Sequence, residues 1–257
     1  VWAWRSGRVR AIARDVDRMM VLFGFEADWY RERGVRAVHV GHPLVDEVPV
    51  MPQIWDLTPE PPFAISLLPG SRTSEIKALL PLLLGAAERL AERFPVELRL
   101  IQAPDLPEAA LREAVRDCPL AVRIVSRQRL REVAGSHLAL CASGTATLEV
   151  GLARTPIVVV YKVKTWSYLL GRLAIRVPFI SLVNLVLRQS VVPELIQGRA
   201  NVERVVAVGL ELLENEETRS RMRSRLRDLR HELGDSGASR RAAAETAAVM
   251  FDGEVPA

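Results

Sequence analysis

Residues 138–149 read LALCASGTATLE, a stretch that predicts a buried strand, a turn of small residues and the start of a helix. Its apolar first part suits a parallel strand that is covered on both faces. Ser143 and Thr145 are residue types that cap helices, and Gly144 lets a ligand approach the backbone. Unpaired N–H groups at the helix start attract an anion, while Glu149, one turn further on, suits ribose hydroxyls. The stretch indicates a nucleotide-sugar site, and an ordinary capped strand–turn–helix is the alternative.

The composition is that of a globular protein, because 49% of the 257 residues are hydrophobic, 26% charged and 5% aromatic. Cys118 and Cys141 lie far apart, which favours a reducing compartment and excludes a disulfide framework. The four histidines lack metal-ligand spacing, so we expect no metal. The net charge of +4 fits a phosphate-rich substrate or an anionic membrane surface. Basic residues are not interleaved with aromatic ones, so we expect no nucleic-acid partner.

The order of predicted elements divides the chain into four segments. Residues 1–46 are expected to be the remnant of an N-terminal domain, and residues 47–62 a proline-rich linker. Strands alternate with helices over residues 63–235, which predicts a parallel sheet with right-handed crossovers. Residues 236–257 are expected to form a final helix and tail. The predicted strands of the second domain are 63–68, 96–102, 121–125, 138–141 and 157–161, and its helices 74–93, 107–117, 129–134, 145–152, 201–215 and 217–233.

A second turn of small residues, LPGSRTSE at 68–75, follows the first strand of this domain. In such folds ligands bind beyond the carboxyl ends of the strands, where both turns are expected to lie. Arg72 could bind a diphosphate through its forked guanidinium, assisted by Ser71 and nearby N–H groups. The alternative is a helix capped by Thr73 or Ser74 beside a solvated arginine.

Two amides near the apolar stretch 177–187 are further candidates. Asn184 lies among hydrophobic residues, and a buried amide needs hydrogen-bond partners. It either bonds the backbone of its own loop or offers a donor and an acceptor to a substrate. Gln189 is a weaker candidate of the same kind.

Three charged features of the sequence allow both a functional and a purely structural interpretation. Lys162, Lys164, Arg172 and Arg176 surround Trp166, which fits an interfacial membrane face or a packed helix. Asp15-Val-Asp17 matches the D-x-D of metal-dependent transferases, but it ends an amphipathic helix, so we assign it no metal. The arginines at 219, 221, 223, 225, 227 and 230 spread around a helix and are expected to be solvated, with phospholipid contact as the alternative.

Taken together, these motifs resemble the lipid-A-disaccharide synthase family of glycosyltransferases. The matching pieces occur in family order, and their order carries the resemblance because each is unspecific alone. After Asn184 the family has a small-residue-Gly-Arg run with an acidic residue, and this chain departs from it with LRQS at 187–190. The pieces are VWAW at 1–4, VGHPL at 40–44 with Asp46, LPGSR at 68–72, ASGTATLE at 142–149, ISLVN at 180–184 and VPEL at 192–195.

The resemblance implies an α/β fold of GT-B type, in which a Rossmann-like parallel-sheet domain binds the UDP-sugar and follows the tail of a Rossmann-like acceptor domain. It implies transfer of 2,3-diacylglucosamine from UDP to 2,3-diacylglucosamine 1-phosphate, forming the β-1,6-linked lipid A disaccharide without metal or other cofactor. Ser71 and Arg72 would contact the diphosphate, with Arg72 stabilising the leaving UDP. The remaining expected donor-site residues are Ser143, Gly144, Thr145, Glu149 at the ribose, Asn184 and Gln189.

The resemblance also implies that the general base lies in an N-terminal part absent from this chain, which alone would be inactive. It implies a cytoplasmic enzyme, peripheral on the cytoplasmic face of the inner membrane, and it leaves room for a homodimer. Two alternatives stay open. One is another GT-B enzyme acting on UDP-sugars, such as a peptidoglycan-precursor transferase or an epimerase, and the other is a non-catalytic UDP-binding or membrane-docking module.

Overall fold

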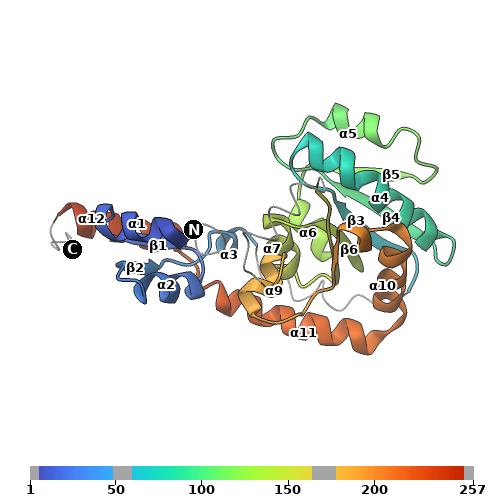
Figure 1. Ribbon diagram of the computed structural model, residues 1–257. Coiled ribbons are helices and arrows are strands. Elements are labelled where there is room, and N and C mark those ends of the chain that lie inside the picture. The colour runs from blue at the N-terminus through green and yellow to red at the C-terminus, as the bar shows by residue number, and fades with distance from the viewer. Residues whose placement is uncertain (1–5, 49–59, 164–177, 252–257) are drawn as a thin grey trace.

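The computed structural model describes residues 6–48, 60–163 and 178–251, which form a small amino-terminal lobe and a larger α/β domain (Figure 1). Three sequence expectations fall outside the described residues. They concern the VWAW stretch, most of the 47–62 linker, and Lys164, Trp166, Arg172 and Arg176 of the predicted membrane face.

The larger domain is built on a six-stranded sheet in which all neighbouring strands are parallel. Central strands β3 and β6 are buried at every residue, as their continuous apolar runs predict for a sheet covered on both faces. Ile65 of β3 aligns with Leu98 of β4 on one side and Leu138 of β6 on the other. The predicted parallel α/β sheet is confirmed. The strands are β3 (Phe63–Leu68), β4 (Val96–Ile101), β5 (Val122–Val125), β6 (Leu138–Ala142), β7 (Ile157–Tyr161) and β8 (Glu194–Ile196).

In the strand order β5-β4-β3-β6-β7-β8, the side of the sheet to which successive strands are added changes between β3 and β6. The strand order is thus reversed at the middle of the sheet. From β3 the chain runs outward through α4 (Thr73–Ala91) to β4, and through α5 (Glu108–Ala114) to β5. Helix α6 (Arg129–Ala134) then returns it to β6 on the other side of β3, and α7 (Thr145–Leu152) leads on to β7. Ligands of open parallel sheets bind beyond the carboxyl ends of the strands at such a reversal. The ends of β3 and β6 are therefore where a site is expected.

Helices α10 (Val202–Glu214) and α11 (Glu216–Glu232) close this domain and contain a buried arginine. Arg219 donates to the carbonyl oxygens of Leu212 and Leu213 at 3.0 and 2.9 Å. These carbonyls belong to the last turn of α10, where they lack helical partners and carry the negative end of the helix dipole. The expectation that the arginines of this segment are all solvated is wrong for Arg219, because a helix end satisfies its guanidinium.

The amino-terminal lobe has a two-stranded parallel sheet and a small core of its own. Tyr30 and Ala27 of its second helix pack against Val21 of the first strand. Its elements are η1 (Ser6–Arg8), α1 (Val9–Asp15), β1 (Met19–Val21), α2 (Gly24–Arg31), β2 (Ala37–His39) and α3 (Leu44–Glu47).

The final helix, α12 (Ala238–Met250), lies beside this lobe and far from the six-stranded sheet (Figure 1). Arg241 Nε donates to the carbonyl oxygen of Val40 at 2.8 Å, and Arg18 of the lobe pairs with Glu245. The N–H of Gly237 donates to Asp46 Oδ1 at 2.9 Å. Residues 236–257 were expected to form a final helix and tail, and these contacts attach α12 of that segment to the amino-terminal lobe.

The join between lobe and sheet domain is also made by arginine. Arg230 of α11 donates to the carbonyl oxygens of Val45, at 3.0 Å, and Val48. It is thus a second exception to the expected solvated arginines, since it satisfies backbone carbonyls at the end of α3.

Helix α7 packs closely against α9 (Leu182–Leu187) and α11 through a glycine. A Cβ at Gly151 would lie 2.6 Å from Leu229 Cδ2 and 3.0 Å from Val183 Cγ2. Both neighbours are fully buried, so neither can move into solvent. The missing side chain therefore sets how closely these helices approach behind the first turn of α7.

We expect Gly151→Ala to lower the free energy of unfolding by about 1–3 kcal/mol, because overpacking forces buried side chains off their preferred rotamers. Urea unfolding of the purified chain measures the loss. Gly198→Ala is the matched control, because a Cβ there meets nothing within 4 Å. Equal unfolding midpoints for the two variants would contradict the tight contact.

Candidate functional site

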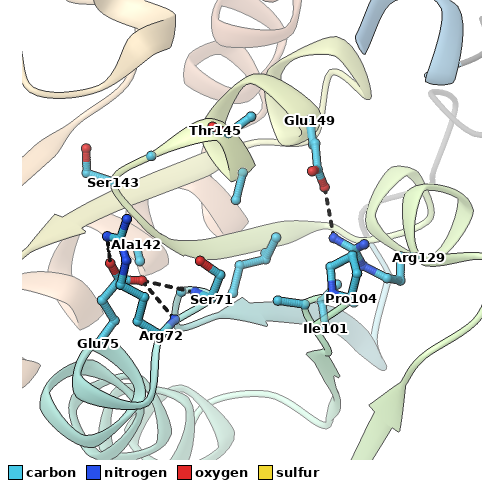
Figure 2. A pocket seen from close by; sticks show the side chains of 15 residues that line it. Ser71, Arg72, Glu75, Ile101, Pro104, Arg129, Ala142, Ser143, Thr145 and Glu149 are labelled. Atoms are coloured by element: carbon cyan, nitrogen blue, oxygen red, sulfur yellow. Dashed lines mark hydrogen bonds and ion pairs between the residues drawn. The ribbon is translucent and has the colours of Figure 1, made fainter. Parts of the chain in front are cut away.

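A cavity of about 260 Å³ lies beyond the carboxyl ends of β3, β4 and β6, at the reversal of strand order. The turn before α4 forms one wall, the turn before α7 another, and the start of α6 a third (Figure 2). Six of the eight residues predicted for the donor site line it. They are Ser71, Arg72, Ser143, Gly144, Thr145 and Glu149.

In the turn between β3 and α4, the hydrogen-bond donors that could bind an anion are occupied by the carboxylate of Glu75. The N–H groups of Ser71 and Arg72 donate to Glu75 Oε2 at 3.0 and 3.3 Å, and Arg72 Nη1 donates to Glu75 Oε1 at 2.9 Å. Gly70 has a φ of +115°, and a Cβ there would collide with Glu75. The turn is therefore shaped to hold a carboxylate against two backbone N–H groups and a guanidinium. An incoming anion can use the same donors by displacing Glu75.

The turn between β6 and α7 leaves its backbone open to the cavity. Gly144 is the N-cap of α7, with φ 150° and ψ −162°, a conformation that essentially only glycine adopts. A Cβ at this position would meet nothing within 4 Å, so a ligand can come close to the backbone. The expectation that Ser143 or Thr145 caps α7 is wrong, because the N-cap is Gly144 and α7 has no side-chain cap. The Ser143 hydroxyl instead donates to the carbonyl of Ile180 at 3.0 Å.

At the other end of the cavity, Glu149 pairs with an arginine that lies outside the sequence motifs. Arg129 Nη2 lies 3.2 Å from Glu149 Oε2, and Figure 2 shows the two side chains meeting across the cavity. The side chains of Arg129 and Glu149 keep 23% and 19% of their exposure. Burial raises the pKa of Glu149, while the neighbouring Arg129 charge lowers it. A sequence signal for Arg129 existed, because it starts a predicted helix that follows a strand at this same sheet edge.

Asn184 is buried in its loop, and its amide is satisfied there. Its Nδ2 donates to the carbonyl of Val192 and to Glu194 Oε1, both at 2.8 Å. Its Oδ1 accepts the N–H groups of Val191 and Val192 at 2.8 and 2.9 Å. Of the two readings of Asn184, the structure favours the structural one. The placement at the donor is not supported, because the side chain does not line the cavity.

Gln189 also lies away from this cavity. Its side-chain oxygen accepts a hydrogen bond from Arg225 of α11, and both residues line a different hollow, with His231. Its placement at the donor is therefore not supported either, because the α9 turn carries it toward α11.

The described residues contain no group of three or more His, Cys, Asp or Glu side chains that could hold a metal ion. Asp15 of the D-x-D pattern lies on an exposed face, where its Oδ1 accepts a hydrogen bond from Arg14 Nε at 2.6 Å.

We expect Asn184→Ala to lower the free energy of unfolding by about 1–3 kcal/mol, since it leaves the buried N–H of Val192 without an acceptor. Asn201→Ala is the control, because Asn201 caps α10 through one hydrogen bond to the N–H of Arg204 and such caps contribute about 1 kcal/mol. Thermal and urea unfolding compare the two variants. A smaller loss for Asn184→Ala than for Asn201→Ala would contradict the structural role.

Comparison with known proteins gives a family for this chain. A family model described as lipid-A-disaccharide synthetase matches residues 1–249. The chain is 43% identical to the lipid-A-disaccharide synthase of Syntrophus aciditrophicus over 95% of its residues, and 39% identical to that of Myxococcus xanthus over 99%. It spans 65% and 68% of the lengths of these two relatives.

Solved structures with the same fold are distant in sequence. An S. aureus MnaA structure with UDP has a TM-score of 0.63 at 15% identity, covering 96% of this chain and 65% of that one. A glycosyltransferase from Rickettsia africae has a TM-score of 0.59 at 12% identity, covering 99% and 69%. A UDP-GlcNAc 2-epimerase from Neisseria meningitidis bound to UDP-GlcNAc has a TM-score of 0.58 at 13% identity, covering 93% and 63%. These likenesses support the GT-B type of fold.

Proposed function

This chain belongs to the lipid-A-disaccharide synthase family, and we propose that it provides the UDP-sugar-binding part of that enzyme. The reaction proposed for the whole protein moves 2,3-diacylglucosamine from UDP to 2,3-diacylglucosamine 1-phosphate, forming the β-1,6-linked lipid A disaccharide and UDP. The observation that carries the proposal is the cavity beyond β3 and β6. It has anion donors at one end and a carboxylate at the other, as a nucleoside diphosphate requires.

The diphosphate is proposed to bind at the turn before α4. It would take the place of the Glu75 carboxylate at the N–H groups of Ser71 and Arg72, at the positive end of a 19-residue helix. The open backbone of Ser143, Gly144 and Thr145 would border the nucleotide between the two ends. Glu149 would accept hydrogen bonds from the ribose hydroxyls, which a carboxylate can do with both oxygens.

Arg72 is proposed to stabilise the leaving group. As the bond between sugar and diphosphate breaks, negative charge grows on the departing UDP, and the Arg72 guanidinium and the helix dipole would stabilise that charge more than they stabilise the ground state. The general base that deprotonates the acceptor hydroxyl is assigned to the acceptor side, outside the residues that line this cavity.

Contact with the inner membrane at its cytoplasmic face is part of the proposal, because both substrates carry acyl chains. Helices of sufficient length and apolarity to span a bilayer are absent from the described part of the chain. Lys162, an exposed member of the predicted basic face, would be close to that surface. The homodimer stays a prediction.

The epimerase alternative shares the fold, as the Neisseria structure shows, but the family match over residues 1–249 favours the synthase. A UDP-sugar epimerase releases an isomerised UDP-sugar, whereas the synthase releases UDP and a disaccharide. Assaying the whole protein for both products, with acylated UDP-glucosamine as donor and 2,3-diacylglucosamine 1-phosphate as acceptor, separates the two functions.

We expect Arg72→Lys to weaken UDP binding to the purified chain nearly as much as Arg72→Ala, by roughly tenfold or more, because an ammonium cannot reproduce a forked contact. Calorimetric titration with UDP, and with uridine as the ligand that lacks phosphate, measures this. Lys77→Ala, an exposed cation on the same helix, is the matched control. Affinities within twofold of wild type in both Arg72 variants would remove Arg72 from the site.

We expect Glu149→Ala to weaken UDP binding by about 1.5–3 kcal/mol, the range for a hydrogen bond to a charged group, and to weaken 2′-deoxy-UDP binding less. The deoxy ligand has already lost one of the hydroxyls that Glu149 would accept. Titration of both ligands into both proteins gives the difference. Equal losses for the two ligands would show that Glu149 serves the fold and not the ribose.

A further inference from the structure

Arg129 enters the cavity from the start of α6, a wall that no sequence motif identified. The preceding residue, Gln128, has φ +50° in the left-handed region, which turns the chain from β5 into the helix. The guanidinium then lies against Glu149, with Nη2 donating to Oε2 at 3.2 Å (Figure 2). The two residues come from different elements, so the pair exists only in the folded domain.

Apart from Arg129, the surroundings of Glu149 disfavour its ionised form. Burial raises the pKa of Glu149, and the carboxylate of Glu47, on α3, raises it further. The Cys141 thiol, on β6, is fully buried, and burial raises its own pKa, so it brings no charge at neutral pH. Arg129 is the neighbour that lowers the pKa of Glu149. Without it, burial and the neighbouring Glu47 carboxylate would raise the pKa of Glu149 further.

The Arg129 guanidinium also carries a donor that the described part of the chain does not satisfy. Its Nε–H is buried and has no hydrogen-bond partner among the described residues. A buried donor without a protein acceptor is uncommon in a native structure, and such groups occur at catalytic and ligand-binding sites, at strained sites and beside ordered water. Here the guanidinium faces the cavity and its ion pair is with a residue proposed to touch the ligand.

We propose that Arg129 is a positioning residue that keeps Glu149 ionised and aimed into the cavity, where it accepts the ribose hydroxyls. This inference rests on the proposed function, because it requires a ribose at Glu149. An ionised Glu149 offers acceptors only, whereas a protonated one carries an O–H that competes as a donor. Arg129 thereby determines the pH range in which the site distinguishes a ribose from a deoxyribose.

The test measures the ratio of the dissociation constants of 2′-deoxy-UDP and UDP between pH 5 and pH 9. The two ligands have the same diphosphate, so its titration cancels in the ratio. In the wild-type chain we expect the preference for UDP to be lost as the pH falls through the pKa of Glu149. Arg129→Gln removes the charge that lowers this pKa, so the loss should begin at higher pH, with its midpoint shifted upward by about 1 pH unit or more.

Arg129→Lys and Arg131→Gln complete the series. Lysine keeps a positive charge but lacks the forked guanidinium. The pH at which the Arg129→Lys variant loses half of its preference for UDP should therefore lie between the values for wild type and Arg129→Gln. Arg131, an exposed residue on the same helix, should leave the wild-type curve unchanged. Melting curves confirm that each variant is folded, and the lysine variant carries the test if the glutamine variant does not fold.

The outcomes separate the two ideas. A wild-type chain that prefers neither ligand at any pH would overturn the role of Glu149 and with it this part of the proposed function. If the wild-type chain prefers UDP and the Arg129→Gln variant shows the same preference at every pH, the role of Arg129 alone is overturned. A preference absent from Arg129→Gln at every pH would also overturn it, in favour of direct contact between Arg129 and the ligand.

Discussion

The site depends on one topological constraint, the return of the chain from β5 across the sheet to β6. Parallel strands need crossover connections, and these are right-handed, so strands added on either side of β3 receive their helices on opposite faces. The connections leaving β3 and β6 therefore diverge, and the space between them is not filled by either. Helices α4 and α7 begin at that gap, so their first backbone N–H groups lie beside it whatever the side chains are. The side chains of Arg72, Glu75, Arg129 and Glu149 then decide what the gap can bind.

Much of the sheet domain could be predicted because its signals are local. The bounds of β7, α6 and α7 agree with the predicted ranges, since each has a distinct apolar or helical pattern with a clear start. Short elements were missed, namely α3, α9 and β8, because a few residues carry too little periodicity. The place of α12 was also missed, since its alanine-rich sequence favours a helix but says nothing of the surface it meets.

The candidate site divides in the same way. The two turns could be predicted from residue type and position, since small residues after a buried strand leave the backbone open at the sheet edge where ligands bind. The partners of their charged side chains could not. Arg129 and Glu149 are 20 residues apart and belong to different helices, so only the folded sheet shows that they meet. Asn184 had the right chemistry for a ligand, but the backbone groups of its own loop lie nearer and satisfy it.

The crossing of α12 back to the amino-terminal lobe has a consequence for the order in which the molecule is assembled. The ion pair between Arg18 and Glu245 joins residues 227 positions apart, and the whole sheet domain lies between them in the sequence. Contacts of such separation form slowly, because the ends of a long loop must first meet. During synthesis the lobe emerges from the ribosome before the sheet domain, whereas α12 emerges after it. The lobe can thus be completed only after the sheet domain has been synthesised, and folding of the sheet domain brings the lobe and α12 together.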